Sequence, residues 1–556
     1  MKALQRLALI GGILAFVGVG THYLSQRPIV MEATEPEVHG QPWLRNGDAP
    51  VALVVDTSIV AANGRSGSFG KTDWSYGWFN LLLQEAPNFD ILDVSQIRDT
   101  AALNRRRTII FTRSATSGMS PGRTNWADAD WWRALSDSGR TVYFELPPNE
   151  FTGWAALDDS ILRLERQGQT FNQVSYLLGP DTSTLSIPCF RLRASGARFA
   201  PLAAGVTIRM AMDSAPTLVE SRLGVARALV AGFDFGALAV TVQQGRPEND
   251  FSVRPRVNKR DGALPLVTAD LCADSSYRNT FQPFFDQFEE VLYAIIDPQA
   301  PEPTLIDSSP RVFVMSHDEE AMGDRAVWMA RQERLWGVTS SYFVIPSNMT
   351  AAGYRALDSA GVEYALHADK YSLFDRPGLP GARPIAREVS FSEQASRLIS
   401  VGTDTAAHRI NRNHWLTWTD RYTENFRRLA AAGVRLDCSY GPLGAEVVGY
   451  LFGTRFPFVP LDTNGFPLPI LELPFLFQDD ERFAVEYLDS AFALSDRDAG
   501  VINFIYHVNT MSHSPDTLVM WSWRESFRRA QNAKAPITTY ERVLEAISTG
   551  PAPLPW

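Results

Sequence analysis

The stretch RVFVMSHDEE, residues 311–320, decides how the second half of this chain folds. Its first five residues form a short apolar run, which is typical of a buried β-strand. A polar cluster that ends in Asp318, Glu319 and Glu320 follows the run directly. In βα folds the chemistry sits where parallel strands end, so we expect functional side chains in this cluster.

The same pattern, a short apolar run followed by a helical pattern, repeats along the rest of the chain. The predicted strands are 311–315, 341–345, 362–367, 434–438, 470–473 and 501–507. The predicted helices are 320–335, 351–360, 392–399, 419–432, 481–494 and 524–533. Strands that are repeatedly separated by helices predict an α/β domain over residues 311–556, either a (β/α) barrel or a related open form.

Histidines recur beside the ends of these predicted strands. His317 follows the first strand, His367 and His507 end two others, and His414 lies in a segment that precedes a helix. These are four of the eight histidines in the chain. Imidazoles that converge with a carboxylate suit a divalent metal, and such a metal makes water a nucleophile near neutral pH.

The order of these motifs resembles the polysaccharide deacetylase (NodB-homology) superfamily. The motifs are the acidic pair 318–319, His367, the arginine segment 409–415, the segment Asp-Cys-Ser-Tyr-Gly at 437–441, and a late strand that ends in His507. The resemblance covers about residues 311–533 and implies a distorted (β/α) barrel. It also implies removal of acetyl groups from N- or O-acetylated sugars.

The resemblance implies a role for each matching residue. Asp318 corresponds to the base that takes a proton from water, and Glu319 to the metal carboxylate. His367 corresponds to a histidine ligand, and Arg412 to the residue that orients the base. His507 corresponds to the acid that protonates the leaving group. The implied metal is zinc, with cobalt or nickel as alternatives.

The sequence departs from the family pattern at three places. The second acidic residue of the pair is usually Asp, and here it is Glu319. The second histidine of the family, four residues after the first, is Tyr371 here. The arginine motif continues with Asn413 and His414 instead of proline. His414 is therefore the expected replacement ligand, with Asp369 as the alternative. The predicted substrate-binding side chains are Trp415, Tyr440 and Asp437.

Each candidate also has a purely structural interpretation. Asp318 and Glu319 could cap a helix, because acidic side chains favour helix N-termini. His367 and His507 could be hydrogen-bonded core histidines, and Arg412 could be the partner in a buried ion pair. The joint placement of these residues beside successive strand ends favours a functional site.

Residues 49–297 predict a separate α/β domain. Apolar runs at 51–56, 108–112 and 141–146 alternate with helical patterns at 74–85 and 128–136, which is typical of a covered parallel sheet. The segments YGWFNLLLQEAPNFDILDVSQI and RTIIFTRS resemble glutamine-amidotransferase-like (flavodoxin-like) domains. The first cysteine is Cys189, so the cysteine nucleophile of that chemistry is missing. We expect a non-catalytic platform for a saccharide or another partner.

The N-terminus predicts a membrane anchor at residues 1–25. Lys2 and Arg6 precede the apolar run 7–20, and these cations favour an orientation with the bulk of the chain outside the cytoplasm. A cleavable signal peptide ending near Gly20 is the alternative. Residues 26–48 predict a tether and 298–310 a linker between the two domains. We expect an inner-membrane anchored protein that faces the periplasm or the cell exterior.

The overall composition narrows the choice of function. A net charge of −10 argues against nucleic acid as a partner, and three distant cysteines form no zinc knuckle. The leading hypothesis is metal-dependent deacetylation of an exopolysaccharide or cell-wall glycan, with polysaccharide-export components of the envelope as partners. The alternatives are a non-catalytic glycan-binding or scaffold protein and a glycoside hydrolase that uses paired carboxylates.

Overall fold

The structure is a computed structural model of the whole chain. It describes residues 29–31, 35–64, 72–85, 88–118, 129–145, 164–171, 174–176, 185–187, 192–199, 206–245, 266–267, 281–301, 305–306, 309–320, 324–369, 371–374, 385–402, 404, 406–418, 422–442, 448–479, 484–492, 499–511, 517–550 and 554–556. The predicted anchor at 1–25 lies outside these residues. None of the described helices is both long and apolar enough to cross a membrane.

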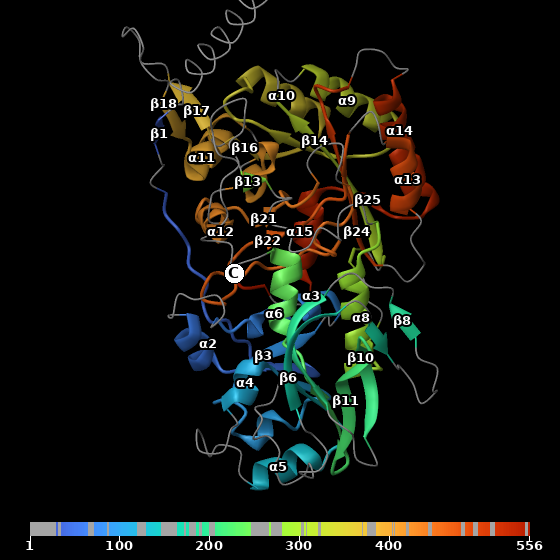
Figure 1. The fold of residues 1–556 in the computed structure, drawn as a ribbon. Helices are drawn as coiled ribbons and strands as arrows, with labels where there is room; N and C mark the ends of the chain where they lie inside the picture. The colour runs from blue at the N-terminus through green and yellow to red at the C-terminus, as the bar shows by residue number, and fades with distance from the viewer. Residues whose placement is uncertain are drawn as a thin grey trace, which may run out of the picture.

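The lower half in Figure 1 is built on a parallel sheet with strand order β3-β2-β4-β5-β12. The strands are β2 (Val51–Val55), β3 (Phe89–Asp93), β4 (Thr108–Phe111), β5 (Thr141–Glu145) and β12 (Ala226–Ala231). In chain order this is 2-1-3-4-5, the order of flavodoxin-like doubly wound folds. Most of their residues are buried, which explains the continuous apolar runs in the sequence.

Antiparallel strands extend this sheet beyond β12, in the order β12-β11-β10-β7-β8. They are β7 (Val174–Tyr176), β8 (Leu185–Ile187), β10 (Thr207–Met212) and β11 (Ala215–Leu223). A separate hairpin pairs β6 (Leu164–Phe171) with β9 (Leu192–Phe199). The insertion between β5 and β12 therefore departs from a simple doubly wound fold.

Short helices cover the parallel sheet. They are α2 (Thr57–Gly64), η2 (Ser75–Gly77), α3 (Trp78–Glu85), η3 (Thr100–Ala102), α4 (Arg113–Gly118), α5 (Ala129–Ser136), α6 (Phe235–Ala239), η5 (Val240–Gln244) and α8 (Phe284–Ile296). The helices predicted at 74–85 and 128–136 are confirmed.

The upper half is a second parallel sheet, with order β22-β21-β19-β16-β15-β14-β24-β23. The strands are β14 (Arg311–Glu319), β15 (Ser341–Val344), β16 (Glu363–Ala368), β19 (Ile410–Asn413), β21 (Leu436–Asp437), β22 (Leu471–Glu472), β23 (Phe477–Gln478) and β24 (Gly500–His507). The sheet curls into an open half-barrel, and β25 (Ile537–Thr538) pairs with β14.

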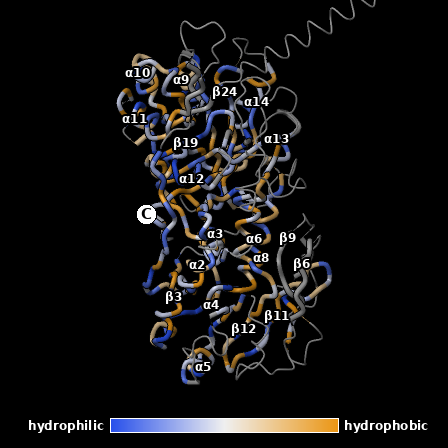
Figure 2. The backbone as a smooth tube through the Cα atoms, turned by 60° about the vertical axis from the view of Figure 1, so that its left-hand side comes forward, coloured by the Kyte–Doolittle hydropathy of each residue, from blue (hydrophilic) through white to orange (hydrophobic). Residues whose placement is uncertain are grey.

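Helices pack on both faces of the half-barrel. Its inner face packs on α15 (Tyr540–Thr549), which contributes Val543, Leu544 and Ile547 to the core. The outer helices are α9 (Asp324–Leu335), α10 (Ala351–Ala360), α11 (Phe391–Val401), α12 (Tyr422–Ala431), α13 (Ala484–Phe492) and α14 (Leu518–Asn532). Figure 2 shows hydrophobic stretches in orange through both halves.

The two halves share one hydrophobic core. The cluster on the inner face of the half-barrel, with Val312 and Phe343, is continuous with Trp78 and Phe288 of the first sheet domain. Segment 459–465 of the half-barrel also bonds directly to that domain. The Asn80 side chain exchanges hydrogen bonds with the Val459 backbone, and Gln244 does the same with the Leu461 backbone.

The segment predicted as a tether runs along both halves (Figure 1). Strand β1 (Ile29–Met31) pairs with β18 (Ile385–Glu388), which pairs with β17 (Tyr371–Phe374). Further along, Gly40 N donates to Asp462 of the half-barrel, and Arg45 forms a backbone bridge to Ile91 in β3. We name residues 29–31 and 35–48 the strap, because they connect the top of the half-barrel to the first domain.

Candidate active site

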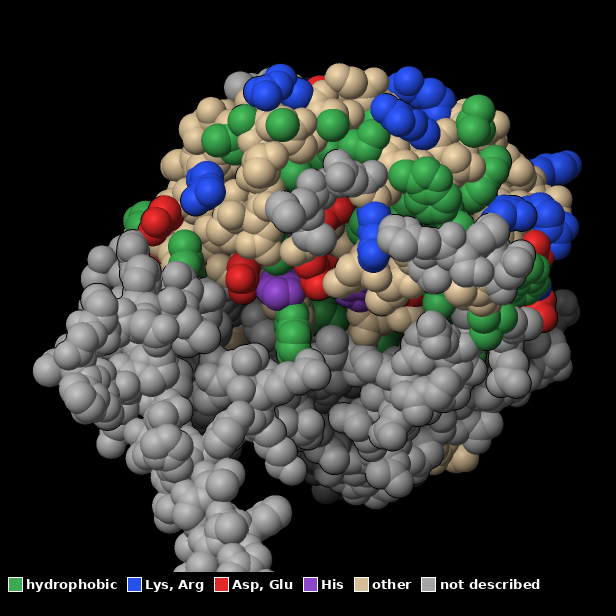
Figure 3. Space-filling view, turned by 90° about the horizontal axis from the view of Figure 1, so that it is seen from above, with side chains coloured by type: hydrophobic (Ala, Val, Ile, Leu, Met, Phe, Trp, Pro, Cys, Tyr) green, Lys and Arg blue, Asp and Glu red, His purple; other side chains and the backbone are tan. Residues whose placement is uncertain are grey.

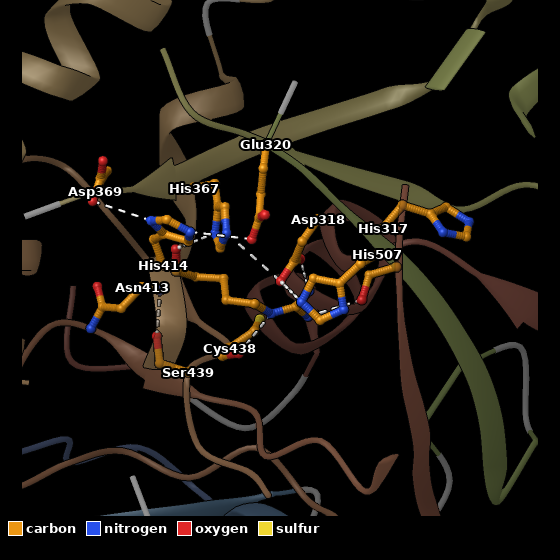
Figure 4. Close-up of polar contacts among 12 residues, drawn as sticks. His317, Asp318, Glu320, His367, Asp369, Asn413, His414, Cys438, Ser439 and His507 are labelled. Atoms are coloured by element: carbon orange, nitrogen blue, oxygen red, sulfur yellow. Dashed lines mark hydrogen bonds and ion pairs between the residues drawn. The ribbon is translucent and has the colours of Figure 1, made fainter. Parts of the chain in front are cut away.

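Strand register brings the predicted site residues to one face of the second sheet. Asp318 of β14 is the cross-strand partner of His507, and His367 of β16 is the partner of Arg412. Side chains directly across neighbouring strands share a face. Asp318, His367, Arg412 and His507 therefore gather at the carboxyl end of the sheet, as Figure 4 shows for the three that it labels.

Arg412 holds the Asp318 carboxylate in the interior. Its Nη1 donates to Asp318 Oδ1 over 2.6 Å, and neither residue is appreciably exposed. The other guanidinium nitrogens donate to Cys438 O, Ser316 Oγ and the Tyr540 hydroxyl. Because its donors are bonded in several directions, the guanidinium has little freedom to move away from Asp318.

Asp318 is ionised in this setting. Burial opposes its negative charge, but Arg412, followed by His367 and His507, outweighs that effect and holds the pKa of the carboxyl well below its usual range. Its second oxygen, Oδ2, lies 3.8 Å from His367 Nε2 and 3.9 Å from His507 Nε2. Asp318 thus lies between two imidazoles with one oxygen free of the arginine.

His507 is a cation in this setting. Its Nδ1 donates to Asp479 Oδ1 over 2.5 Å. Burial alone would lower the pKa of His507, but the charge and hydrogen bond of Asp479 raise it to about 9. The imidazole is partly exposed, with its Nε2 on the side of Asp318. A protonated, oriented imidazole beside an ionised carboxylate is the pair that acid–base hydrolysis needs.

Beside Asp318 lies a group of three side chains that can hold a metal ion. Among the described residues, ligand atoms of Glu320, His367 and His414 all lie within 4.8 Å of one another. Two imidazoles and a carboxylate, with a position left for water, is the ligand set of many catalytic zinc sites. The residues therefore match a divalent ion in type and number.

A buried ligand atom supports this fit. His367 Nδ1 donates to the Arg412 carbonyl over 3.0 Å, which leaves Nε2 as the acceptor. That Nε2 is buried without a hydrogen-bond partner. Burial also lowers the pKa of His367 to about 4, against the opposing charge of Asp318, so the ring is neutral as a metal ligand must be.

His414 is held between two carboxylates. Nδ1 lies 3.2 Å from Asp369 Oδ1, and Nε2 lies 3.2 Å from Glu320 Oε1. Burial opposes its charge, but these hydrogen bonds raise the pKa of His414 to about 9. A metal bound at His414 therefore has to displace a proton. Of the two alternatives in the sequence, His414 is in the cluster, and Asp369 orients it.

Glu319, the predicted metal carboxylate, is not in this cluster. β14 continues to Glu319 instead of ending near Met315, so its side chains alternate between faces up to that point. Asp318 faces the site, whereas Glu319 points away from it and affects the pKa of Tyr342. The carboxylate that joins the histidines is the next residue, Glu320.

Trp415 remains a candidate for substrate contact. It is 42% exposed, and its ring packs edge-on against His414, with centroids 5.8 Å apart. Both Trp415 and Leu416 have positive φ, 58° and 50°. Non-glycine residues rarely adopt this conformation, and such strain concentrates at functional sites. The strained turn places the tryptophan beside the metal-type cluster.

The other two predicted substrate contacts are buried. Tyr440 is fully buried, and its hydroxyl donates to Gln244 O of the first domain. Asp437 is buried against Asn411, Ser439 and Glu472, and burial raises its pKa. Neither side chain reaches the surface of the site, so these positions are structural. The side chain of Tyr371 lies outside the described residues.

His317, which follows the first predicted strand, faces away from the site. Its ring bonds to Tyr506 O and Glu333 on the outer side of the sheet. Glu333 also accepts from Ser340, Tyr342 and Trp523. This network anchors the outer face of β14 directly behind Asp318.

Glu320 and Asp479 belong to the site, although neither was predicted from the sequence as a site residue. Glu320 was part of the quoted polar cluster but was assigned to the helix that follows. Asp479 directly follows β23, a short strand that was not predicted. An acidic residue after an apolar LFQ segment was the available signal. Figure 3 shows histidine and acidic side chains together on the face seen from above.

Solved structures resemble part of the chain. They include a CE4 domain of a xylanase from the hindgut metagenome of Trinervitermes trinervoides (10% identity, TM-score 0.26), covering 44% of this chain and 94% of that one. A protein described as a polysaccharide deacetylase from Mycobacterium smegmatis has 13% identity and TM-score 0.29, covering 45% and 93%. One from Bordetella bronchiseptica, described as involved in O-antigen biosynthesis, has 14% identity and TM-score 0.24, covering 42% and 88%.

Two of these neighbours are described as polysaccharide deacetylases and one as a CE4 domain, and the likeness is distant and partial. No family model matches the chain, and no curated protein is similar to it. No comparison supports the amidotransferase-like resemblance of the first domain.

Proposed function

We propose that this protein is a metal-dependent deacetylase that hydrolyses acetyl groups on an extracytoplasmic polysaccharide. One observation carries the proposal: the ionised Asp318, clamped by Arg412, lies between the cationic His507 and the cluster of Glu320, His367 and His414. The arrangement combines a base, an acid and a metal ligand set within one buried group. Two of the solved structures named above are described as polysaccharide deacetylases, and a polysaccharide is the substrate class that we propose.

The residues of this chain divide the reaction between them. Asp318 takes a proton from water as the water oxygen bonds to the acetyl carbon. His507 gives a proton to the sugar nitrogen or oxygen as its bond to that carbon breaks. The products are acetate and a free amine or hydroxyl. A divalent ion held by Glu320, His367 and His414, zinc or else cobalt or nickel, would polarise the acyl carbonyl and make water more acidic.

Two further residues prepare the acid–base pair. Arg412 keeps Asp318 ionised and fixed, and Asp479 keeps His507 protonated with Nε2 on the side of Asp318. Trp415, exposed beside His414, offers a ring on which a sugar can stack. We also propose that the anchor at 1–25 holds the enzyme at the envelope, near the export components that deliver its polymer.

The first experiment compares two adjacent glutamates. Metal content and acetate release from an acetylated chitooligosaccharide are measured for the native chain and for Glu320→Gln and Glu319→Gln. We expect about one metal equivalent in the native protein and in Glu319→Gln, and a 10- to 100-fold loss of affinity in Glu320→Gln. Glu319 is the matched control, because it is the same residue type on the other side of the sheet.

The second experiment separates catalysis from binding. Asp318→Asn keeps the shape of the side chain and removes the base. Acetate release should fall by at least about 10²-fold while metal remains bound. Native protein that binds glycan and metal without releasing acetate would instead identify a non-catalytic glycan-binding protein.

A further inference from the structure

The first strand of the strap, β1, is joined through β18 and β17 to the edge of the candidate site. Met31 of β1, Arg387 of β18 and Ser372 of β17 lie in one row across the small sheet. Neighbouring strands are about 4.8 Å apart, so the Met31 backbone lies about 10 Å from Ser372. Ser372 is three residues after Asp369, which bonds to His414.

Chain length then sets how far the predicted anchor can be from the site. Three residues span at most about 10 Å, which places Met31 within about 20 Å of Asp369. Six further residues separate Met31 from residue 25, the end of the predicted anchor, and they span at most about 21 Å. The edge of the site at Asp369 therefore lies within about 40 Å of the end of the anchor.

Exposed apolar side chains surround the site on this same face. Trp328 lies in the first half of α9, and Leu518 and Trp521 lie in the first turn of α14, each about 41% exposed. Both helices follow strands that end at the site, β14 and β24, so their N-terminal turns border it. Trp415, beside His414, is exposed as well, so three exposed tryptophans lie near the carboxyl end of the sheet.

Tryptophan is the residue most typical of the membrane–water interface, where its ring is apolar and its N–H remains hydrated. Figure 3 shows hydrophobic side chains (green) and Lys and Arg side chains (blue) around the histidines on this face. From these observations we propose that the face with Trp328, Leu518 and Trp521 lies against the lipid bilayer, so that the candidate site, with Trp415 at its edge, opens toward the membrane surface.

The consequence concerns the substrate. A site that faces the bilayer meets polymer at the membrane surface, where a chain emerges from its export apparatus or is attached to a lipid. That this site removes acetyl groups rests on the proposed function. Its orientation does not, because contact with lipid can be measured without any turnover.

The test uses the full chain in phosphatidylcholine vesicles, with an environment-sensitive fluorophore on a single engineered cysteine. Trp521→Cys places the label on the proposed lipid face. Val225→Cys is the control, because Val225 is also exposed and lies in the β11–β12 turn at the far end of the first domain. Cys189 and Cys272 are changed to Ser, and Cys438 is buried.

We expect spin-labelled lipid to quench the label at position 521 and to leave the label at 225 bright. Changing Trp328 and Leu518 to Ser in the Trp521→Cys variant should weaken that quenching, because two interfacial side chains are lost. No quenching at 521, or equal quenching at both positions, would overturn the proposal. Metal content and acetate release from a soluble oligosaccharide, measured on the same samples, report on the proposed function separately.

Discussion

Each half of the molecule places an arginine–carboxylate pair at the carboxyl end of a parallel sheet, but the two pairs differ in their surroundings. Arg412 with Asp318, and Arg113 with Asp234, both have N–O distances of 2.6 Å. Arg412 is fully buried, whereas the Arg113 side chain is 44% exposed. Among the residues that the structure describes, only the first pair has imidazoles beside it.

The carboxyl ends of the two sheets also differ in what covers them. In the first domain, Glu145 at the end of β5 accepts from Trp78 Nε1 and from the backbone of Phe235, both in helices of that domain. Segment 459–465 of the half-barrel packs above, where Thr72 Oγ1 donates to Thr463 O. The edge where doubly wound folds bind ligands is thus occupied by the chain itself. A polar cluster at the ends of strands therefore indicates a functional site only where its polar atoms are not already bonded to other parts of the chain.

The largest expected difference comes from removing each arginine. Arg412→Met leaves Asp318 buried without its counter-ion, which costs about 3–5 kcal/mol of unfolding free energy and abolishes acetate release. Arg113→Met should cost less, about 1–3 kcal/mol, with unchanged activity, because the Arg113 side chain is partly exposed even though Asp234 is buried. Denaturant unfolding and acetate assays on both variants test this. Equal losses of unfolding free energy in the two variants would contradict this explanation, which rests on the different exposure of the two arginines.

The second prediction concerns pH. His507 has a pKa of about 9, raised by Asp479, so it is protonated and active as an acid at neutral pH. Activity should fall as pH rises through about 9. Asp479→Asn removes the supporting charge, so this alkaline limb should move toward the ordinary histidine value of about 6.5. An unmoved limb in the pH–rate profile would exclude His507 as the acid.

The third prediction concerns segment 459–465, which covers the carboxyl end of the first sheet. A Cβ on Gly64 would lie 2.7 Å from the backbone of Asn464 in the covering segment. Gly64→Ala should therefore cost about 1–3 kcal/mol by forcing the two apart, while the folded fraction keeps its activity on a soluble substrate. Gly139→Ala is the control, since nothing lies within 4 Å of its added Cβ. Thermal unfolding of the two variants should differ accordingly.

The smallest effect is expected at Glu145. Burial, followed by the charge of Asp234, raises the pKa of Glu145 well above the usual carboxyl range. A raised carboxyl pKa means that its stability contribution is present below about pH 4.5 and is lost as pH rises toward the folded-state value. Glu145→Gln should cost about 1 kcal/mol or less at pH 5 and flatten the fall in stability above it. A stability–pH curve parallel to that of the native protein would contradict this.

Much of this architecture could be predicted from the sequence, because buried parallel strands leave continuous apolar runs. The runs at 51–56, 108–112, 141–146 and 341–345 all correspond to strands. Strand β19, Ile410–Asn413, has a polar sequence, and its pairing with β16 gives no local signal. The hairpin β6–β9 was missed for the same reason, since LRASGARF has no apolar run.

The type of site was predicted from the sequence, but not every residue that belongs to it. Asp318, His367, Arg412, His414 and His507 come together as expected. The choice between Glu319 and Glu320 depended on how far β14 extends, because side chains alternate between the two faces only as far as the strand continues. That length is fixed by pairing with β15 and β24, which lie far away in sequence. The burial of Tyr440 likewise depends on the other domain.

The strap has a consequence for how the protein is made. Strand β1 pairs with β18, whose first residue, Ile385, lies in the second half of the chain. At 5–20 residues per second, the partner strand is synthesised about 20–70 s after β1. Until then an unpaired strand edge is available to other chains. Cell-free synthesis that pauses before residue 385 should therefore produce a species that is unusually prone to aggregation and to proteolysis near its N-terminus.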